Sequence, residues 1–228
     1  MKIAAFDTSS KALTLAILED ETLLAQMTLN IKKNHSITLM PAIDFLMNSL
    51  DMKPKDLDRI VVAQGPGSYT GLRIAVATAK TLAHTLKIEL VGVSSLLALV
   101  PEQVEGLVIP VMDARRNNVY AGFYQPDQAV RPEAHLPLAE VLEIAGAANQ
   151  PVTFVGETAA FVEQIEAALP QAAIQPTLPD AGAIGRLGLD LPAQSIHDCV
   201  PNYLKRVEAE ENWLKTHQAS SVSYIQRL

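Results

Sequence analysis

The chain has 228 residues, a formal net charge of −7 and a single cysteine, Cys199. This length can bury a core as one large domain or two small ones. The acid excess argues against a free-standing nucleic-acid-binding protein, because Lys and Arg supply most of the affinity for phosphate backbones. The lone cysteine excludes an internal disulfide and a zinc cluster built on cysteines. A largely disordered chain is excluded by 49% hydrophobic and 19% charged residues.

Neither a membrane span nor a signal peptide is predicted. The apolar runs stay below the roughly 18 residues that a span needs. The stretch before Asp7 at the N-terminus is too short for a signal peptide. We therefore expect a cytoplasmic protein with no membrane partner.

The first half contains five predicted strands and two predicted helices. The strands cover 2–7, 12–20, 21–30, 59–64 and 88–93, and the helices cover 36–50 and 72–86. The first helix is predicted from apolar residues every three or four positions. Pro41 inside it predicts either a late start or a kink. The order is strand, strand, strand, helix, strand, helix, strand.

The second half is predicted to repeat this order. Strands are expected over 107–113, 119–124, 151–157 and 172–176, and helices over 138–148 and 159–169. Asp7 and Asp113 end the first strand of each half. Two facing halves of this kind form the duplicated α/β fold of actin, sugar kinases and Hsp70 ATPases (the ASKHA fold). We predict lobes over 1–100 and 101–203, with a last helix over 204–217 packing back on the first lobe.

A glycine-rich segment, Gly65 to Gly71, lies between a strand and a helix, as phosphate loops do. Thr70 stands where a dinucleotide fingerprint needs glycine, and no Gly-Lys-Ser/Thr follows as in a Walker loop. The segment is therefore interpreted as a tight turn whose glycines allow positive φ and close helix–strand contact, with Ser68 or Thr70 as helix cap.

Both first-hairpin turns, 7–11 and 113–117, lack the glycine that lets a backbone approach a triphosphate. Hydroxyl groups remain in the first turn, so weak phosphate binding is predicted and efficient ATP hydrolysis is not. We expect no cofactor beyond weakly bound ADP or ATP. The candidate nucleotide residues are Asp7, Thr8, Ser9, Ser10, Gly65, Gly67, Ser68 and Asp113.

Catalytic and metal-binding residues are not predicted. His35 has Leu39 where a metal pair on one helix needs a second histidine. Cys199 follows His197 closely, yet a lone cysteine is more typical of a core position.

The two helices of the first half are apolar on more than one side. Such helices are typical of burial or of cover by another chain. We predict a partner interface formed by Leu39, Met40, Ile43, Met47, Leu72, Ala75, Val76, Ala79, Leu82 and Ala83.

Several segments together resemble the TsaB (YeaZ) family of the bacterial tRNA threonylcarbamoyladenosine system. They are FDTSSKALTLAI, HSITLMPAIDFL, GPGSYTGLRIAVATAKTLA, GVSSLLAL, VMDARRNNVYAGFY and PNYLKRVEAEENW, and they extend over nearly the whole chain. Tyr69 replaces the phenylalanine common in that family, and 125–179 carries no family signature.

The resemblance implies a duplicated actin-like fold with a degenerate nucleotide site and a non-catalytic role. It implies heterodimerisation with TsaD, the transferase that carries a His-x-x-x-His metal pair, and recruitment of the ATPase TsaE. Without TsaD it implies a homodimer through the same helices, and it implies only indirect contact with tRNA. The alternatives are an ATP-dependent phosphotransferase with Asp7 or Asp113 holding magnesium, and a metallo-hydrolase.

Overall fold

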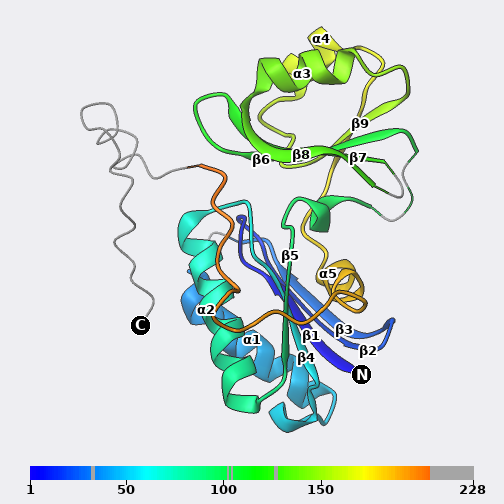
Figure 1. Ribbon diagram of the computed structural model, residues 1–228. Helices are drawn as coiled ribbons and strands as arrows, with labels where there is room; N and C mark the ends of the chain where they lie inside the picture. Colours follow the sequence, from blue (N-terminus) through cyan, green and yellow to red (C-terminus); the bar gives the residue numbers. More distant parts are fainter. Residues whose placement is uncertain (32–33, 102, 104, 126–127, 206–228) are drawn as a thin grey trace, which may run out of the picture.

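The computed structural model describes residues 1–31, 34–101, 103, 105–125 and 128–205. They form two lobes, each built on a five-stranded sheet (Figure 1). The first lobe contains β1 (Lys2–Asp7), β2 (Leu13–Glu19), β3 (Thr22–Leu29), α1 (His35–Ser49), the 3-10 turn η1 (Pro54–Asp56), β4 (Arg59–Ala63), α2 (Tyr69–Leu86) and β5 (Glu89–Val93).

The first sheet has the strand order β3-β2-β1-β4-β5. β1, β4 and β5 are parallel, and β2 and β3 pair antiparallel at one edge. β4 is buried at every residue, which explains the apolar run that follows Arg59. Helices α1 and α2 lie side by side on one face of this sheet (Figure 1). All seven predicted elements of this half are present, with ends displaced by up to three residues; Pro41 lies inside α1.

The second lobe repeats the arrangement with β6 (Leu107–Asp113), β7 (Asn118–Gln125), β8 (Gln128–Pro137), α3 (Leu138–Gly146), β9 (Val152–Gly156), α4 (Val162–Ala168) and β10 (Ala173–Pro176). Its strand order, read from the edge strand β8, is β8-β7-β6-β9-β10, which matches the order β3-β2-β1-β4-β5 of the first sheet strand for strand. The duplicated α/β architecture is therefore confirmed. The pattern did not predict β8, an edge strand with an exposed proline and an exposed arginine.

A further helix, α5 (Ala181–Leu187), follows the second lobe and packs on β1 and β2 of the first. It covers the face of the first sheet opposite α1 and α2 (Figure 1). Gly185 permits this contact, since a Cβ there would lie 2.3 Å from Leu18 Cδ1. The predicted boundary is therefore corrected: 180–203 belongs to the first lobe, because α5 packs on β1 and β2 and places Ala181 and Ile184 in the core on that face of the sheet. The predicted helix over 204–217 lies, from 206 onward, outside the described residues.

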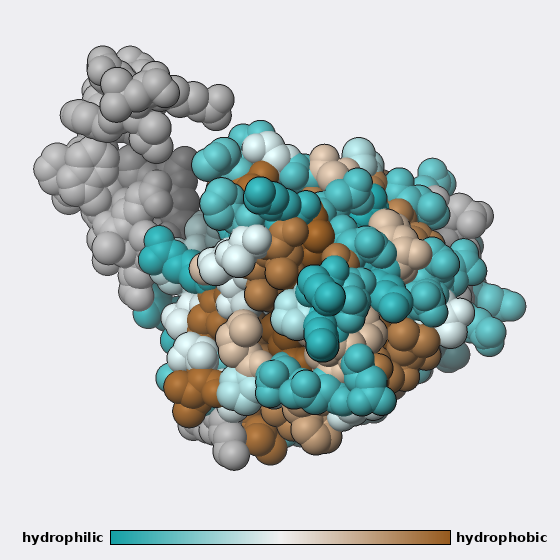
Figure 2. Space-filling model, turned by 90° about the horizontal axis from the view of Figure 1, so that it is seen from below, coloured by the Kyte–Doolittle hydropathy of each residue, from teal (hydrophilic) through white to brown (hydrophobic). Residues whose placement is uncertain are grey.

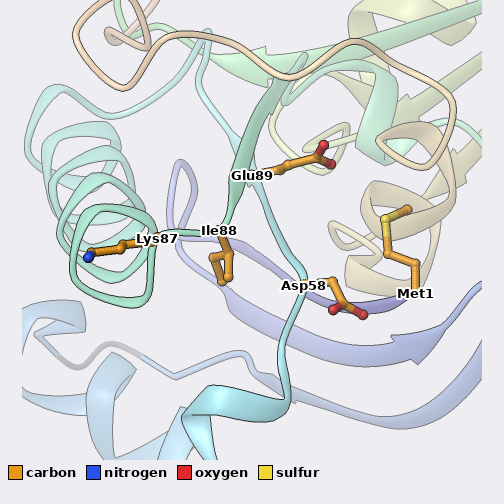
Figure 3. Close-up of a pocket in the computed structure, with 5 residues that line it drawn as sticks. All are labelled: Met1, Asp58, Lys87, Ile88 and Glu89. Carbon is orange, nitrogen blue, oxygen red and sulfur yellow. The ribbon is translucent and has the colours of Figure 1, made fainter.

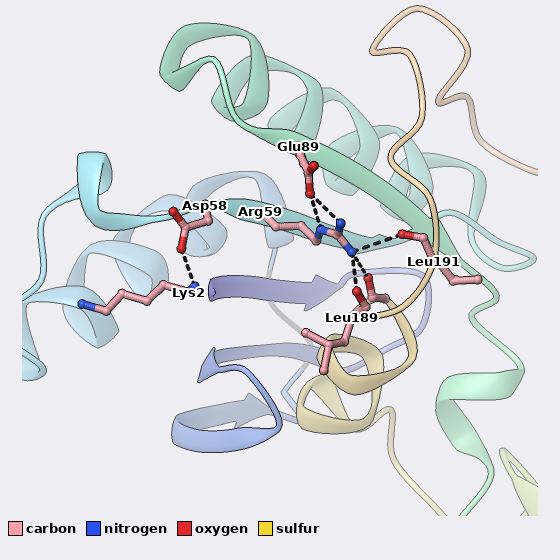
Figure 4. Close-up of polar contacts among 7 residues, drawn as sticks. Lys2, Asp58, Arg59, Glu89, Leu189 and Leu191 are labelled. Atoms are coloured by element: carbon pink, nitrogen blue, oxygen red, sulfur yellow. Dashed lines mark hydrogen bonds and ion pairs between the residues drawn. The ribbon is translucent and has the colours of Figure 1, made fainter.

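Arg59 fixes the segment that follows α5 (Figure 4). Its Nη1 donates to the carbonyl oxygens of Gly188, Leu189 and Leu191 at 2.6, 2.7 and 3.2 Å. Its Nε and Nη2 donate to Glu89 Oε2 at 2.8 and 2.5 Å. These bonds hold the start of the segment over 188–203, here termed the return segment, and Gln194 N and Asn202 N donate to Leu90 O and Gln64 O further along it.

The chain passes between the lobes twice, once over 94–106, which includes the 3-10 turn η2 (Leu97–Leu99), and once over 177–180. Thr177 Oγ1 donates to Leu99 O at 2.8 Å, which ties the two crossings together. Ser94 and Tyr124 both donate to Glu133, joining the end of β5 to the second sheet. None of the helices within the described ranges has the length and hydropathy needed to cross a membrane.

Candidate functional site

The turn after β1 is closed to solvent. Asp7, Thr8 and Ser9 are at most 2% exposed. Asp7 Oδ1 accepts from Ser9 N at 2.6 Å, and Asp7 Oδ2 accepts from Ser9 Oγ at 3.0 Å. Burial raises the pKa of Asp7 to about 6, although the bonds from Ser9 oppose the shift. The hydroxyls predicted to face a phosphate are thus used inside the turn.

The glycine-rich segment closes that turn from outside. Ser68 N donates to Ser9 O at 2.7 Å, and Thr8 Oγ1 donates to Gly71 O at 2.7 Å. A Cβ at Gly71 would lie 2.0 Å from Thr8 O, so only glycine fits here. Gly65 has φ +129°, and Ser68 caps α2. The interpretation as a tight turn in close contact is confirmed, and the cap is Ser68 rather than Thr70.

A cavity of about 400 Å³ lies between the lobes. Ser10, Lys11 and Asn30 line it from the first lobe, and Asp113 and Glu157 from the second. Asp113 Oδ1 accepts from Arg115 N at 2.7 Å, and Asp113 N donates to Glu157 Oε2 at 3.0 Å. A cavity lined by one lysine and two carboxylates is a poor electrostatic match for a triphosphate.

The eight residues predicted to bind nucleotide therefore do not form one site in the structure. Ser10 and Asp113 line the cavity between the lobes. The other six do not line it, because Asp7, Thr8 and Ser9 are buried in the turn and Gly65, Gly67 and Ser68 belong to the segment that covers that turn. Within the described part of the chain, no three His, Cys, Asp or Glu side chains come together in a group that could hold a metal ion.

His35 and Cys199 take structural positions. His35 Nε2 lies 3.0 Å from Ser10 O, which joins the start of α1 to the hairpin turn. Leu39, one turn later, is buried. Cys199 is fully buried in the core under α2, and burial raises the pKa of its thiol, which disfavours the nucleophilic thiolate.

The predicted partner interface needs correction. Eight of its ten residues are at most 5% exposed and belong to the packed interior of this chain: Leu39, Ile43, Met47, Leu72, Ala75, Val76, Ala79 and Ala83. These residues cannot contact a partner, because they lie on the sides of α1 and α2 that pack against the first sheet. Leu82 packs partly buried against the same core, and Met40 is 47% exposed.

The surface of α1 nevertheless carries a row of exposed apolar side chains. Ile37 is 68%, Met40 47% and Phe45 59% exposed, and Pro41 is exposed between them. Their spacing of three to four residues places them on one side of the helix. This row is here termed the α1 stripe. Seen from below, the first lobe shows apolar patches among polar atoms (Figure 2).

The sequence contained a signal for the α1 stripe, which the interface prediction used at Met40 and missed at Ile37 and Phe45. Ile37, Met40 and Phe45 extend the apolar pattern beyond the width that one buried face needs. A second apolar face on a helix that already covers a sheet indicates a surface that another chain covers.

Fold and site together define the class: a two-lobed protein of the actin, sugar kinase and Hsp70 type in which the glycine segment closes the first-hairpin turn. A family model described as TsaD, tRNA N6-adenosine threonylcarbamoyltransferase, matches residues 22–213. The tRNA threonylcarbamoyladenosine biosynthesis protein TsaB of Bacillus subtilis is 41% identical over 96% of this chain and 100% of its own. An uncharacterized protein of Mycobacterium tuberculosis is 30% identical over 91% of this chain and 93% of its own.

Solved structures agree with these sequence matches. YeaZ from Pseudomonas aeruginosa superposes with a TM-score of 0.75 at 26% identity, covering 89% of this chain and 99% of that one. The ethanolamine utilization protein EutJ from Carboxydothermus hydrogenoformans shares the fold alone, with a TM-score of 0.50 at 15% identity over 83% of this chain and 89% of its own. The chain belongs to the TsaB (YeaZ) family of TsaD-like proteins.

Proposed function

We propose that this protein is a non-catalytic subunit of tRNA threonylcarbamoyladenosine biosynthesis, which binds TsaD, holds it in an active shape and recruits TsaE. The observation that carries the proposal is the α1 stripe, an apolar surface left open after the helix has covered its own sheet. In the cytoplasm such a surface is most stable when a partner covers it.

One further observation supports a partner of related fold, and another supports a role as a subunit rather than as the transferase. The family model that matches the chain describes a transferase, so the proposed partner has a related fold and can present a matching pair of helices. The turn that a nucleotide-using relative would open to phosphate is filled here by the glycine segment.

The same stripe supports self-association when TsaD is absent. A two-fold symmetric pair needs only one self-complementary patch. We propose that the isolated chain forms a homodimer through the α1 stripe and that TsaD displaces the second copy.

The test is co-purification of the full chain with TsaD, followed by a tRNA modification assay with TsaE present. Phe45→Asp should abolish co-elution and lower modification at least tenfold, because it places a charge in the apolar stripe. Val130→Asp is the matched control, because Val130 is 46% exposed in β8 of the second lobe; it should leave both measurements unchanged. Full modification by Phe45→Asp, or by TsaD and TsaE without this chain, would refute the proposal.

A second proposal concerns nucleotide. The cavity between the lobes offers Lys11 and Ser10 to a phosphate group and Asp113 and Glu157 against it, which supports weak ADP or ATP binding without turnover. Isothermal titration calorimetry with Mg-ATP should detect at most a small heat of binding and a low affinity. Tight binding with phosphate release would instead favour the phosphotransferase alternative.

A further inference from the structure

The charges of this acidic chain are unevenly placed. From Arg59 to Ile88 the sequence contains no Asp or Glu, although the whole chain carries a net charge of −7. Arg73 and Lys80 are seven residues apart and lie along one flank of α2, and Lys87, seven residues further on, is the C-cap of the helix. Exposed charges act over about one Debye length, roughly 8–10 Å, so this local excess of cations is what a ligand meets.

This basic flank is separate from the surface proposed for TsaD. Ile74 and Leu82 lie on the opposite flank of α2, where they pack against the core that α1 shares. The basic flank is bordered instead by the return segment, which runs along α2 (Figure 1). Lys80 Nζ donates to His197 O at 3.4 Å across that border. A ligand on the basic flank would thus leave the α1 stripe free.

Two tyrosines meet at the N-terminal end of the flank. The rings of Tyr69 and Tyr203 stack with centroids 4.8 Å apart, and the guanidinium of Arg73 lies 4.6 Å from the centroid of Tyr69. Tyr69 is 42% and Tyr203 40% exposed. An exposed stacked pair beside a cation is an arrangement that accepts a further planar ring.

Of the described residues, three acidic ones neighbour this flank, and one of them, Glu89, is paired with a cation outside it. Glu89 is bonded to Arg59, and Asp58 Oδ2 accepts from Lys2 N at 2.7 Å (Figure 4). These two carboxylates share a hollow of about 670 Å³ with Lys87, whose side chain points away from both of them (Figure 3). Asp198 is an exposed acid on the return segment, next to His197, whose carbonyl oxygen accepts from Lys80.

We infer that the basic flank of α2 is an RNA-binding surface for the tRNA substrate, with phosphates on Arg73, Lys80 and Lys87 and an unpaired base on the Tyr69–Tyr203 stack. Regularly spaced cations fit a phosphate backbone, and the aromatic pair fits a base; an acidic protein surface would use the cations alone. The inference rests on the proposed function for the identity of the RNA. It replaces the expectation of purely indirect tRNA contact.

The test is fluorescence anisotropy with the full chain and a labelled tRNA transcript at about 50 and 200 mM salt. Arg73→Gln with Lys87→Gln should weaken binding about tenfold at the lower salt and flatten the salt dependence. Lys53→Gln with Lys55→Gln removes the same charge from an exposed turn on the first lobe and should change neither. Tyr203→Ala should weaken binding at least threefold, and Tyr203→Phe should restore it.

Three outcomes would overturn the inference: no tRNA binding by the wild-type chain, equal losses in both double variants, or unchanged binding in Arg73→Gln/Lys87→Gln. If that variant instead loses TsaD, the flank binds an acidic protein surface. Phe45→Asp separates the two proposals, since it should lose TsaD and keep tRNA. Circular dichroism melting of each variant controls for folding.

Discussion

Individual glycines decide what the segment after β4 can do. A Walker loop uses its glycines to bring backbone amides to a phosphate. Here Gly71 brings α2 against the carbonyl of Thr8, and Ser68 N binds Ser9 O. Both uses place glycines between a strand and a helix, and the contact distances show which use applies here.

Replacing Gly71 with Ala should destabilise the protein by about 1–3 kcal/mol, because the new methyl group would collide with backbone that cannot move aside. Gly146→Ala is the control: its Cβ would lie 3.3 Å from the end of the Leu169 side chain, which can shift. Urea unfolding of both variants checks this. Equal effects would show that the contact at Gly71 is not tight.

Asp7 gives stability a pH dependence. Its folded pKa of about 6 lies above the ordinary value of 3.8, so between these values the unfolded chain loses its proton first. Wild-type stability therefore falls as pH rises through this window, by roughly 3 kcal/mol in total. Asp7→Asn keeps an oxygen that accepts from Ser9 N. Because its side chain does not titrate, the stability of this variant does not fall with pH in this window.

The unfolding free energy of Asp7→Asn, measured against wild type, should thus increase by roughly 3 kcal/mol between about pH 4 and pH 7. Urea titrations at several pH values measure it. Asp113→Asn, on the exposed aspartate at the matching position of the second lobe, is the control. A difference that does not vary with pH would contradict the assigned burial.

At the scale of elements, α1 illustrates the limit of periodicity. The pattern predicted the helix but not which apolar side is covered by the chain itself. Apolar residues recur every three to four positions on both sides of α1. The packing of α1 on β2 and β3 is what buries Ile43 and leaves Phe45 on the surface.

Ile43→Asp should therefore lower stability by about 4 kcal/mol or more, because it buries an unpaired charge. Phe45→Asp, two residues away on the exposed side, should stay within about 1 kcal/mol of wild type. Thermal unfolding of the two variants is the measurement. Comparable melting temperatures would mean that α1 docks by a different face.

Two elements, β8 and α5, were not predicted. β8 is an edge strand whose exposed polar residues and proline weaken its alternation. α5 is seven residues long and rich in glycine and alanine, with too few turns for a periodic signal. Both are stabilised by what they pack on rather than by their own sequence.

On the scale of the whole molecule, the chain returns to its first lobe after it has formed the second. Ala181 and Ile184 fill the second face of the first sheet, and Arg59 holds the return segment beside it. The first lobe is thus completed by residues that follow the second lobe.

A fragment of residues 1–100 should therefore fail to fold cooperatively, since it exposes the apolar face that α5 covers. Joining 178–205 to it through a flexible linker should restore a cooperative transition in circular dichroism. A control linker carrying the same residues in scrambled order should not. Cooperative folding of 1–100 alone would show that α5 is dispensable.

The sequence by itself determined the repeated strand–helix order, the absence of a phosphate-loop signature and the family, because these depend on local pattern and on motifs. The tertiary structure decided which apolar face is covered, which hydroxyls are buried and where the chain returns to its first lobe. Those properties depend on contacts between residues far apart in the chain, and the periodicity of one segment carries no information about its partner.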